Sequence, residues 1–537
     1  MLKLLSEIKN AIYLRNPIYN IILENKSENE LLLKIEDFWG GDPDIGRKMI
    51  GGYINFFGEG INYKFNIWER NNASRLWNQQ LHSFDWIKNL RAVGSNKARL
   101  FLRDCVSKWL LNNRNWVKNT WEKEILARRV VNLLTNLSFF YETADESFKF
   151  RLSKNINKQC FFLFSGFENK IVRKNEIYVV KAYILASLSY KNLSHKFNFS
   201  LRKLNELIEN NLSEDGMHYL RSPSEHLKFL QSLIDIKLYL GGAKIKIPAK
   251  LNNTINLMSS VLKFFKMGDG ELSIFNKYNF IEKNIVEKVL KRANSKIGVP
   301  TELKTSGFNR ISKNRLNLII DCGSPSIEET HAGTLSFEMS HGSEKIIVNC
   351  GSPFINNKEW GHAMRSTAAH STVNIENVNS SDIFFNKESR TRIAKATYQK
   401  VIKGNNYWID TKHYGYKDIF GLIHNRRLYV ETNNLIVKGE DCFTATNNFK
   451  TKVPLVMNIR FHIHPDIRSS VTGSKKKAVL QLKNNLGWEF ICSESKVKIK
   501  EGIYLGGKKI VQKNNYILIS KNIIDGEKIK WMFRLIQ

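Results

Sequence analysis

The sequence predicts an α+β protein of two large domains, a helical N-terminal half followed by an antiparallel β-sandwich. Its 537 residues are too many for one ordinary hydrophobic core. Apolar residues recur at helical spacing from about residue 75 to 290, and short β-rich segments follow from about residue 300. We therefore expect domains at residues 1–298 and 299–537, with the boundary in KRANSKIGVPTELK.

The helical half is predicted from segments whose apolar residues are three and four positions apart. They are ARLFLRDCVSKWLLNN (98–113), ILARRVVNLLTNLSFFY (125–141), EIYVVKAYILASLSY (176–190) and SEHLKFLQSLIDIKLYL (224–240). The Gly-containing stretch GGYINFFGEGINYKFNIW before them predicts short strands or turns. Many amphipathic helices joined by short breaks are typical of a helical array or toroid.

The C-terminal half is predicted from short segments rich in β-branched and aromatic residues. They include RLNLIIDCG, TLSFEMS, KIIVNCG, STVNIEN, RRLYVETNNLIVKGED, LVMNIRFHI, AVLQLKNN, WEFICSE and YILISKN. Gly, Asn, Ser and Lys turns separate them at intervals of roughly 8–12 residues. This pattern indicates an antiparallel sandwich.

Composition limits the class of protein. With 42% hydrophobic and 11% aromatic residues, the chain can bury a core, so global disorder is excluded. The 83 Lys and Arg against 50 Asp and Glu give a net charge of +33. This charge has two interpretations: a surface that attracts polyanions, or genome-wide drift toward Lys and Asn.

The remaining composition signals are negative. Six cysteines lie far apart without a CxxC pair, so we expect reduced structural thiols. The N-terminus lacks the apolar core of a secretory signal, and no run of apolar residues is long enough to span a membrane. By sequence alone we expect a cytoplasmic protein.

Several motifs, in a shared order over residues 75–470, resemble the heparinase II/III-like polysaccharide lyases. In the helical half they are WNQQLHSFDWIKNL, RKNEIYVVKAYILASL and EDGMHYLRSPSEHLKFL. In the β-rich half they are THAGTLSFEMSHGSEKIIVNCGSPF and RSTAAHSTVNIEN. The resemblance implies an incomplete (α/α) toroid packed on an antiparallel β-sandwich, and a periplasmic location is common in that family.

The resemblance also implies β-elimination on a uronate-containing glycan. An Asn neutralises the uronate carboxylate, and Tyr or His groups move the protons, because the C5 proton is acidic only when that charge is masked. Asn175 matches this Asn, His226 matches the final His of the SPxYH element, and His331 matches the second His of HxH. Glu225 stands at the catalytic Tyr, and Glu329 at the first His of HxH.

A metal, usually zinc, is implied in the sandwich of the family. Its ligands would be His331, His370 and an Asp, but Asn349 replaces that Asp here. Two imidazoles with a neutral amide make a poor zinc site. We therefore expect no firm metal centre, with His331 and His370 as the weak candidates.

Further residues are candidates for binding the glycan. Arg221 and Arg365 suit anionic groups, since a guanidinium binds carboxylate or sulfate in a bidentate manner. His218 and Tyr219 precede the helix of Glu225 and rim the expected cleft. The last candidates are Trp77 and His82, because aromatic faces stack on sugar rings.

Each candidate has a structural alternative. Asn175 also suits a helix cap, and Ser222 with Glu225 also suits a capping box. Trp77 and most tryptophans also suit the helical core. His331 and His370 also suit satisfied buried histidines.

The sequence thus leaves several functions open. The first is a lyase that acts on an acidic polysaccharide by β-elimination. The second is a glycan-binding protein without catalysis, and the third is a hydrolase that uses Glu225 and Glu329 as an acid and base pair. Nucleic-acid binding has no motif in support, and the oligomeric state is open.

Overall fold

The structure is a computed structural model, and its two compact units are described separately. It describes residues 21–23, 31–32, 35–68, 72–113, 115, 117, 119–164, 176–277, 280–328, 331–352, 358–383, 392–446, 454–492, 494–507 and 511–536. The helical unit comprises residues 1–211 and 232–252, and the sheet unit comprises residues 212–231 and 253–537. The division therefore falls within helices α12 and α13.

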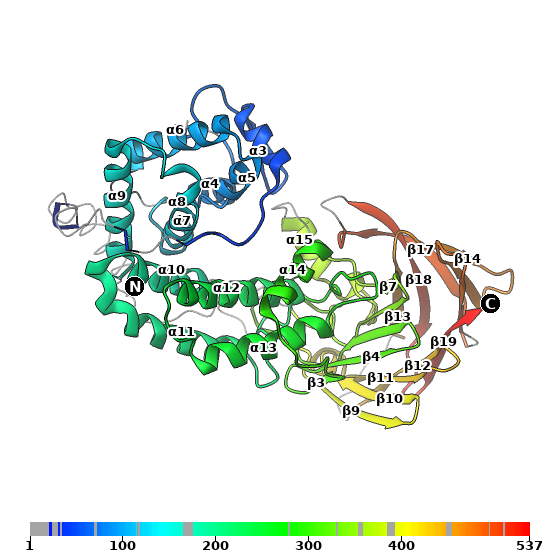
Figure 1. The fold of residues 1–537 in the computed structure, drawn as a ribbon. Coiled ribbons are helices and arrows are strands. Elements are labelled where there is room, and N and C mark those ends of the chain that lie inside the picture. The colour runs from blue at the N-terminus through cyan, green and yellow to red at the C-terminus, as the bar shows by residue number, and fades with distance from the viewer. Residues whose placement is uncertain are drawn as a thin grey trace. The chain divides into compact units, whose positions relative to one another are not determined.

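The helical unit carries most of the helices (Figure 1). They are α3 (Pro43–Ile50), α4 (Arg75–His82), α5 (Ile87–Val93), α6 (Asn96–Asn113), α7 (Lys123–Thr135), α8 (Leu137–Phe140), α9 (Glu146–Phe164), α10 (Glu176–Ser189), η1 (Lys191–Lys196), α11 (Phe197–Asn211) and the C-terminal half of α12 (Pro223–Gly242). A two-stranded antiparallel ribbon, β1 (Tyr53–Phe56) with β2 (Glu59–Asn62), precedes α4, as the Gly-containing stretch predicts.

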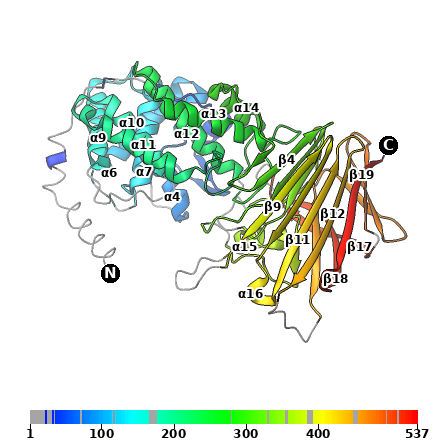
Figure 2. The same ribbon diagram turned by 90° about the horizontal axis from the view of Figure 1, so that it is seen from below.

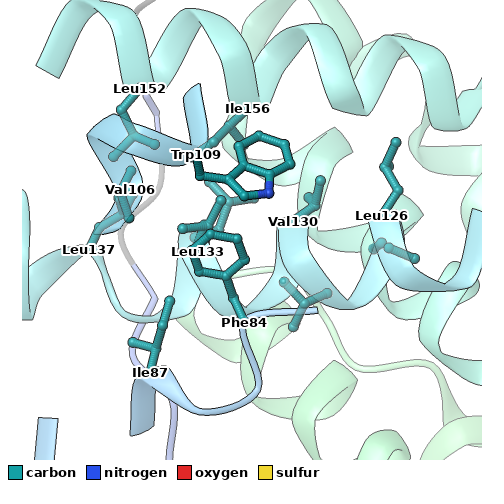
Figure 3. Close-up of a cluster of buried hydrophobic side chains, with 14 of the residues drawn as sticks. Phe84, Ile87, Val106, Trp109, Leu126, Val130, Leu133, Leu137, Leu152 and Ile156 are labelled. Atoms are coloured by element: carbon teal, nitrogen blue, oxygen red, sulfur yellow. The ribbon is translucent and has the colours of Figure 1, made fainter. Parts of the chain in front are cut away.

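The core of the helical unit forms where the apolar faces of these helices meet (Figure 3). Trp109 of α6 is 1% exposed and lies edge-on to the ring of Phe84 at 5.8 Å between ring centroids. Val130 and Leu133 of α7 pack in the same cluster. Burial of such a side chain contributes about 1.5–3 kcal/mol. Because the apolar residues are the buried ones, their spacing in the sequence predicts the positions of these helices.

The sheet unit contains a few helices and two large sheets. The helices are the N-terminal half of α12, most of α13 (Ala249–Phe264), α14 (Lys283–Ala293), α15 (Lys358–Arg365), η2 (Thr367–Ala369) and α16 (Lys417–Phe420). The strands are β3 (Glu302–Leu303), β4 (Phe308–Lys313), β5 (Leu316–Asp321), β6 (Phe337–His341), β7 (Glu344–Val348), β8 (Val373–Ile375), β9 (Ala396–Lys403), β10 (Asn406–His413), β11 (Leu422–Glu431), β12 (Ile436–Ala445), β13 (Val456–Ile463), β14 (Arg468–Val471), β15 (Lys477–Gln481), β16 (Gly487–Ile491), β17 (Val497–Tyr504), β18 (Gln512–Asn522) and β19 (Lys528–Ile536).

The two sheets form an antiparallel sandwich (Figure 2). One has the order β14-β15-β16-β19-β12-β11-β10-β9, and the other has the order β17-β18-β13-β7-β6-β5-β4-β3 with β8 beside β13. Phe337 and Phe461 of the second sheet pack against Trp531 and Phe533 of the first in one buried cluster. The inner faces of both sheets therefore share one core.

A buried ion pair lies inside this sandwich. Asp441 of β12 accepts hydrogen bonds from Nε (2.7 Å) and Nη2 (3.0 Å) of Arg426 of β11, and both side chains are fully buried. Arg426 also donates through Nη1 to the carbonyl oxygens of Leu335 (2.9 Å) and Ser371 (3.0 Å). Arg426 thus links β11 by a hydrogen bond to Ser371, the residue that directly follows His370.

The predicted fold class is confirmed, with differences in detail. The structure adds β3, β4, β9, β10, β14, β17 and β19, which lie outside the predicted segments. The β-rich sequence begins at β3, close to the predicted boundary at residue 299, while the compact sheet unit also includes α14 and parts of α12 and α13.

Two further expectations concern cysteines and membrane spans. All six cysteines are buried and none forms a disulfide, as predicted. Within the described part of the chain, no helix combines the length and the apolar character needed to cross a bilayer.

Candidate functional site

The N-terminus of α12 presents Glu225 at a fixed position. The backbone N–H of Glu225 donates to Oγ of Ser222 (3.4 Å), which is the Ser222 half of the capping box given as the structural alternative. The Glu225 carboxylate pairs with Lys228 (2.8 Å). Burial alone would raise the pKa of the Glu225 carboxyl, but the charges of Lys228 and Lys277 outweigh burial and hold this pKa below its usual range. Glu225 is therefore an anion at neutral pH.

His226, a predicted catalytic residue, is engaged by the backbone instead. Its Nε2 lies 2.8 Å from the carbonyl oxygen of Met258, so Nε2 carries the proton and donates. Its Nδ1 faces the backbone N–H of His218 (3.4 Å). The imidazole is fully buried, and burial lowers its pKa to about 4. These contacts indicate a structural role, because both ring nitrogens are used within the protein.

His218 and Tyr219 divide between the interior and the surface. The ring of His218 packs on Tyr219 and Phe229, and burial lowers its pKa to about 3. Tyr219 is half-buried, and its hydroxyl donates to the carboxylate of Glu328 (2.9 Å). Of the two, Tyr219 is the more exposed residue.

Arg221, predicted to bind a substrate anion, has its own counterion. Its Nη2 donates to the buried carboxylate of Asp321, and its Nε donates to the carbonyl oxygen of Ser306 (2.9 Å). The guanidinium also lies 4.6 Å from the ring centre of Phe308. The prediction for Arg221 is therefore corrected, because a buried guanidinium that neutralises an internal carboxylate has no charge to spare for a ligand.

His331 and His370 come together, as the motif order suggests. Nδ1 of His331 lies 3.4 Å from Nε2 of His370, and the two rings are perpendicular. His370 Nδ1 lies 2.7 Å from the carbonyl oxygen of Ser366, so this nitrogen is the donor and Nε2 is the acceptor. His331 must then donate through Nδ1, which leaves its lone pair on Nε2.

Both of these histidines are neutral at physiological pH. Burial lowers the pKa of His370 to about 4. Burial is the main cause that lowers the pKa of His331 well below its usual range, and unfavourable electrostatic interactions of a protonated His331 with His370, Arg365 and Lys277 add to it. The structure therefore brings Arg365 and Lys277 within electrostatic range of His331, and Lys277 also acts on Glu225.

Lys277 was not recognised from the sequence. It follows Asn276, a residue with a positive φ whose side chain donates to the carbonyl oxygen of Arg221 (2.7 Å). The Lys277 carbonyl in turn accepts from the hydroxyls of Ser222 (2.6 Å) and Ser224 (3.0 Å). These bonds tie its turn to the start of α12, and no local sequence pattern announces them.

The residues present do not fit a zinc centre. Asn349 donates to the carbonyl oxygen of Ile274 (2.9 Å) and accepts from the backbone N–H of Ser371 (3.0 Å). Its side-chain amide therefore links two backbone segments. Among the described residues, no group of three His, Cys, Asp or Glu side chains is arranged to hold a metal. His331 and His370 are also hydrogen-bonded to each other, which occupies one nitrogen of each.

Trp77 and His82 belong to the core of the helical unit, so their predicted stacking role is corrected. Trp77 is 1% exposed, and its indole N–H donates to the carbonyl oxygen of Glu59 (3.0 Å). His82 stacks on Trp68 and accepts from the indole of Trp109 (3.1 Å). Ring faces that are covered by protein have no area left for a sugar.

Two predicted residues lie outside the described part of the chain. They are Asn175, the expected partner of the uronate carboxylate, and Glu329, the expected second glutamate. The site that the structure describes thus consists of Glu225, Lys277, His331, Arg365 and His370, all in the sheet unit.

Comparison with known proteins places this geometry in context. Residues 299–532 match the family model described as heparinase II/III-like, C-terminal. A curated relative, FtsZ-localized protein C of Caulobacter vibrioides (strain NA1000 / CB15N), is 24% identical over 517 residues, which cover 91% of this chain and 88% of the relative.

Solved structures share the fold. A crystal structure of heparinase III has a TM-score of 0.75 at 13% identity and covers 96% of this chain and 89% of that chain. The heparan sulfate lyase HepC from Pedobacter heparinus has a TM-score of 0.63 at 15% identity, with coverages of 92% and 82%. At these identities the likeness concerns the architecture, a helical region followed by antiparallel sheets.

Proposed function

We propose, since residues 299–532 match the heparinase II/III-like C-terminal family model, that the chain acts on an acidic, uronate-containing polysaccharide as a β-eliminating lyase. The observation that carries this proposal is the His331–His370 hydrogen bond, which leaves a lone pair on Nε2 of a neutral His331, while the charges of Arg365 and Lys277 act on the same imidazole. A proton acceptor beside positive charge is the combination that β-elimination needs.

The roles of these groups follow from the chemistry. A cation near the uronate carboxylate stabilises the extra negative charge that develops when the C5 proton leaves. Lys277 and Arg365 are the candidates for this task among the described residues. Nε2 of His331 accepts the proton, and His370 fixes the tautomer by accepting from Nδ1. Because the pKa of His331 is well below neutral, this base is always unprotonated but weak, and we expect slow turnover.

The test is the formation of an unsaturated uronate. Full-length protein is incubated with heparan sulfate, hyaluronan, chondroitin sulfate, alginate and polygalacturonate, and far-ultraviolet absorbance of the product is followed. His331→Ala and Lys277→Ala should abolish product formation, whereas the matched control His195→Ala, an exposed histidine of the helical unit, should not. Absence of product on every substrate with the unaltered protein would exclude the lyase.

A second candidate is a glycan-binding protein without catalysis. It is favoured by Glu225, which stands at the family's catalytic Tyr and is held as an anion by Lys228. This candidate predicts glycan binding without turnover, and Glu225→Gln should leave the affinity unchanged. A lowered pKa also makes Glu225 unsuited to the general acid of a hydrolase, whose pKa must be raised.

A further proposal concerns where the protein works. The curated relative is by its name localised with FtsZ, and the match spans nearly the whole of both chains. We therefore expect this chain to localise with FtsZ in its own cell. A fluorescent fusion should lose its pattern when FtsZ is depleted, and a pattern that persists or is diffuse from the start would exclude this proposal.

A further inference from the structure

The outer face of the sheet formed by β14–β16, β19 and β9–β12 carries an unusual row of side chains. The registers place Trp408 (β10) opposite Tyr429 (β11), Tyr429 opposite Lys438 (β12), Lys438 opposite Met532 (β19), and Met532 opposite Ile491 (β16). We call these five residues the aromatic row. Neighbouring positions along each strand face the core, so the row lies on the side of the sheet that faces away from the core.

The aromatic row differs from the rows beside it. On one side, Arg427 pairs with Asp410 and with Glu440 (3.4 Å). On the other side, Arg534 pairs with Glu489 (2.6 Å). A solvated sheet face is usually covered by charged and polar side chains. A row of aromatic and aliphatic side chains between ion pairs is unusual on such a face, and it indicates a binding surface.

The aromatic rings remain available on this face. Trp408 and Tyr429 are half-buried, their ring centroids are 5.0 Å apart, and they are tilted by 46°. The ammonium of Lys438 lies 5.5 Å from the centre of the Tyr429 ring. Two adjacent rings and a cation thus form a continuous surface across three strands.

The row continues into a hollow with a cationic edge. A cavity of about 340 Å³ is lined by residues that include Tyr429, Lys438, Lys530 and Met532. Neither Lys438 nor Lys530 has a carboxylate partner among the residues that the structure describes, although Arg427, Arg534 and Lys528 nearby are all paired. Glu440 also lines the hollow, opposite Lys530 in the register, and pairs with Arg427 and Lys528. One carboxylate against Arg427, Lys438 and Lys530 leaves the lining with an excess of positive charge beside apolar surface.

From this arrangement we propose that the aromatic row is a second binding site for an acidic oligosaccharide, separate from the site of His331 and His370. The C–H faces of a pyranose stack on electron-rich aromatic faces, and the ammonium groups of Lys438 and Lys530 pair with carboxylate or sulfate groups. The row crosses five strands, or four spacings of about 4.8 Å, which gives about 19 Å for an extended oligosaccharide.

Other occupants fit the row less well. An added β-strand needs a sheet edge with unpaired backbone groups, but β10, β11, β12, β19 and β16 each have paired strands on both sides. A bilayer needs a broad apolar patch, whereas this row is one residue wide and lies between rows of ion pairs. A row of this width that ends in a hollow with two lysines matches a single anionic chain.

The proposal is tested with the full-length protein by isothermal titration calorimetry. The probes are size-fractionated heparin oligosaccharides, oligogalacturonates of the same length and neutral cello-oligosaccharides. The variants are Trp408→Ala/Tyr429→Ala and Lys438→Gln/Lys530→Gln. The matched control is Phe65→Ala, since Phe65 is an aromatic residue that is 82% exposed in the helical unit.

We expect the aromatic double variant to weaken binding of at least one acidic probe by tenfold or more. The lysine double variant should weaken it and reduce its salt dependence, while the neutral probe should bind poorly and Phe65→Ala should have no effect. Circular dichroism spectra and urea transitions of the variants check that the fold is intact.

Three outcomes would overturn the proposal. The unaltered protein binds none of the acidic probes, or the aromatic double variant binds them as tightly as the unaltered protein does. The third is that vesicles of anionic lipid are bound through the row while the oligosaccharides are not.

The choice of acidic probes rests on the proposed function, but the two can fail separately. Lys277→Ala/Arg365→Ala alters the other site and should leave one of two binding events intact. Loss of turnover with retained binding would count against the lyase only, and retained turnover with unchanged binding by Trp408→Ala/Tyr429→Ala would count against the aromatic row only.

Discussion

Replacement of Asp441 by Asn tests how much the buried ion pair with Arg426 contributes to the sheet unit. The Asp441 carboxylate accepts four hydrogen bonds: Oδ1 from His424 (2.9 Å) and Arg426 Nε (2.7 Å), Oδ2 from Arg426 Nη2 (3.0 Å) and Trp531 (2.8 Å). Burial would raise the pKa of this carboxyl, but Arg426 and His424 outweigh burial and hold the pKa well below its usual range.

The expected magnitude follows from these contacts. The amide introduced by Asp441→Asn retains one oxygen, so two of the four donors face an amide N–H and are left unsatisfied at about 1–3 kcal/mol each. One of these two donors belongs to Arg426, whose charge stays buried without a counterion, so the two costs overlap and fall within the loss of about 3–5 kcal/mol that is typical when one partner of such a pair is removed. We therefore expect Asp441→Asn to lower the free energy of unfolding of the sheet unit by about 3–5 kcal/mol.

The assay is urea denaturation followed by tryptophan fluorescence and circular dichroism, with the transition of the sheet unit analysed separately. Asp410→Asn is the matched control, because Asp410 forms an ion pair with Arg427 on the same sheet, with the two side chains 47% and 49% exposed. An exposed pair contributes only about 0–1 kcal/mol. If Asp441→Asn lowers the stability no more than Asp410→Asn does, the reasoning about buried charge is wrong.

The remaining predictions concern three other buried contacts. Asn349→Asp should lower the melting temperature with or without added zinc, because a carboxylate oxygen would face the carbonyl oxygen of Ile274; a zinc-dependent rise in a thermal scan would contradict this. Burial raises the pKa of Glu338 to about 7, so the folded state keeps a proton that the unfolded state loses; stability should fall as pH rises from about 4.5 to about 7, and urea titrations of Glu338→Gln should show a flatter profile. Gly439→Ala should destabilise the sheet unit by about 1–3 kcal/mol in the same assay, because a β-carbon would overlap the indole of Trp531; a neutral result would show that the ring can move.

The helices and most strands could be predicted because their periodicity reflects burial directly. The hydrogen-bond partners of single polar residues could not be predicted. Arg221 and Asp321 are 100 positions apart in the chain, and no local pattern announces that they pair. His226 similarly depends on a carbonyl 32 positions away. A motif fixes the place of such residues in the chain, while their partners decide whether they are open to a ligand.

Trp77 carries a sequence signal that favours the core alternative over stacking on a sugar. It lies four positions before Leu81, and both side chains are 1% exposed. This spacing marks the inner face of a helix, so the sequence favoured a core residue over a sugar platform. The aromatic row was missed for a different reason, since it needs the register of five strands, which the sequence does not reveal.

The six buried thiols can report on local unfolding of this protein, because each becomes accessible to a reagent only when the structure around it opens. A thiol reacts as the thiolate and only when a reagent reaches it, so alkylation in the native state measures transient exposure. Cys105 and Cys160 report on the helical unit, and the other four report on the sheet unit. Mass spectrometry of alkylated peptides would therefore rank the two units by how often each opens, without any introduced label.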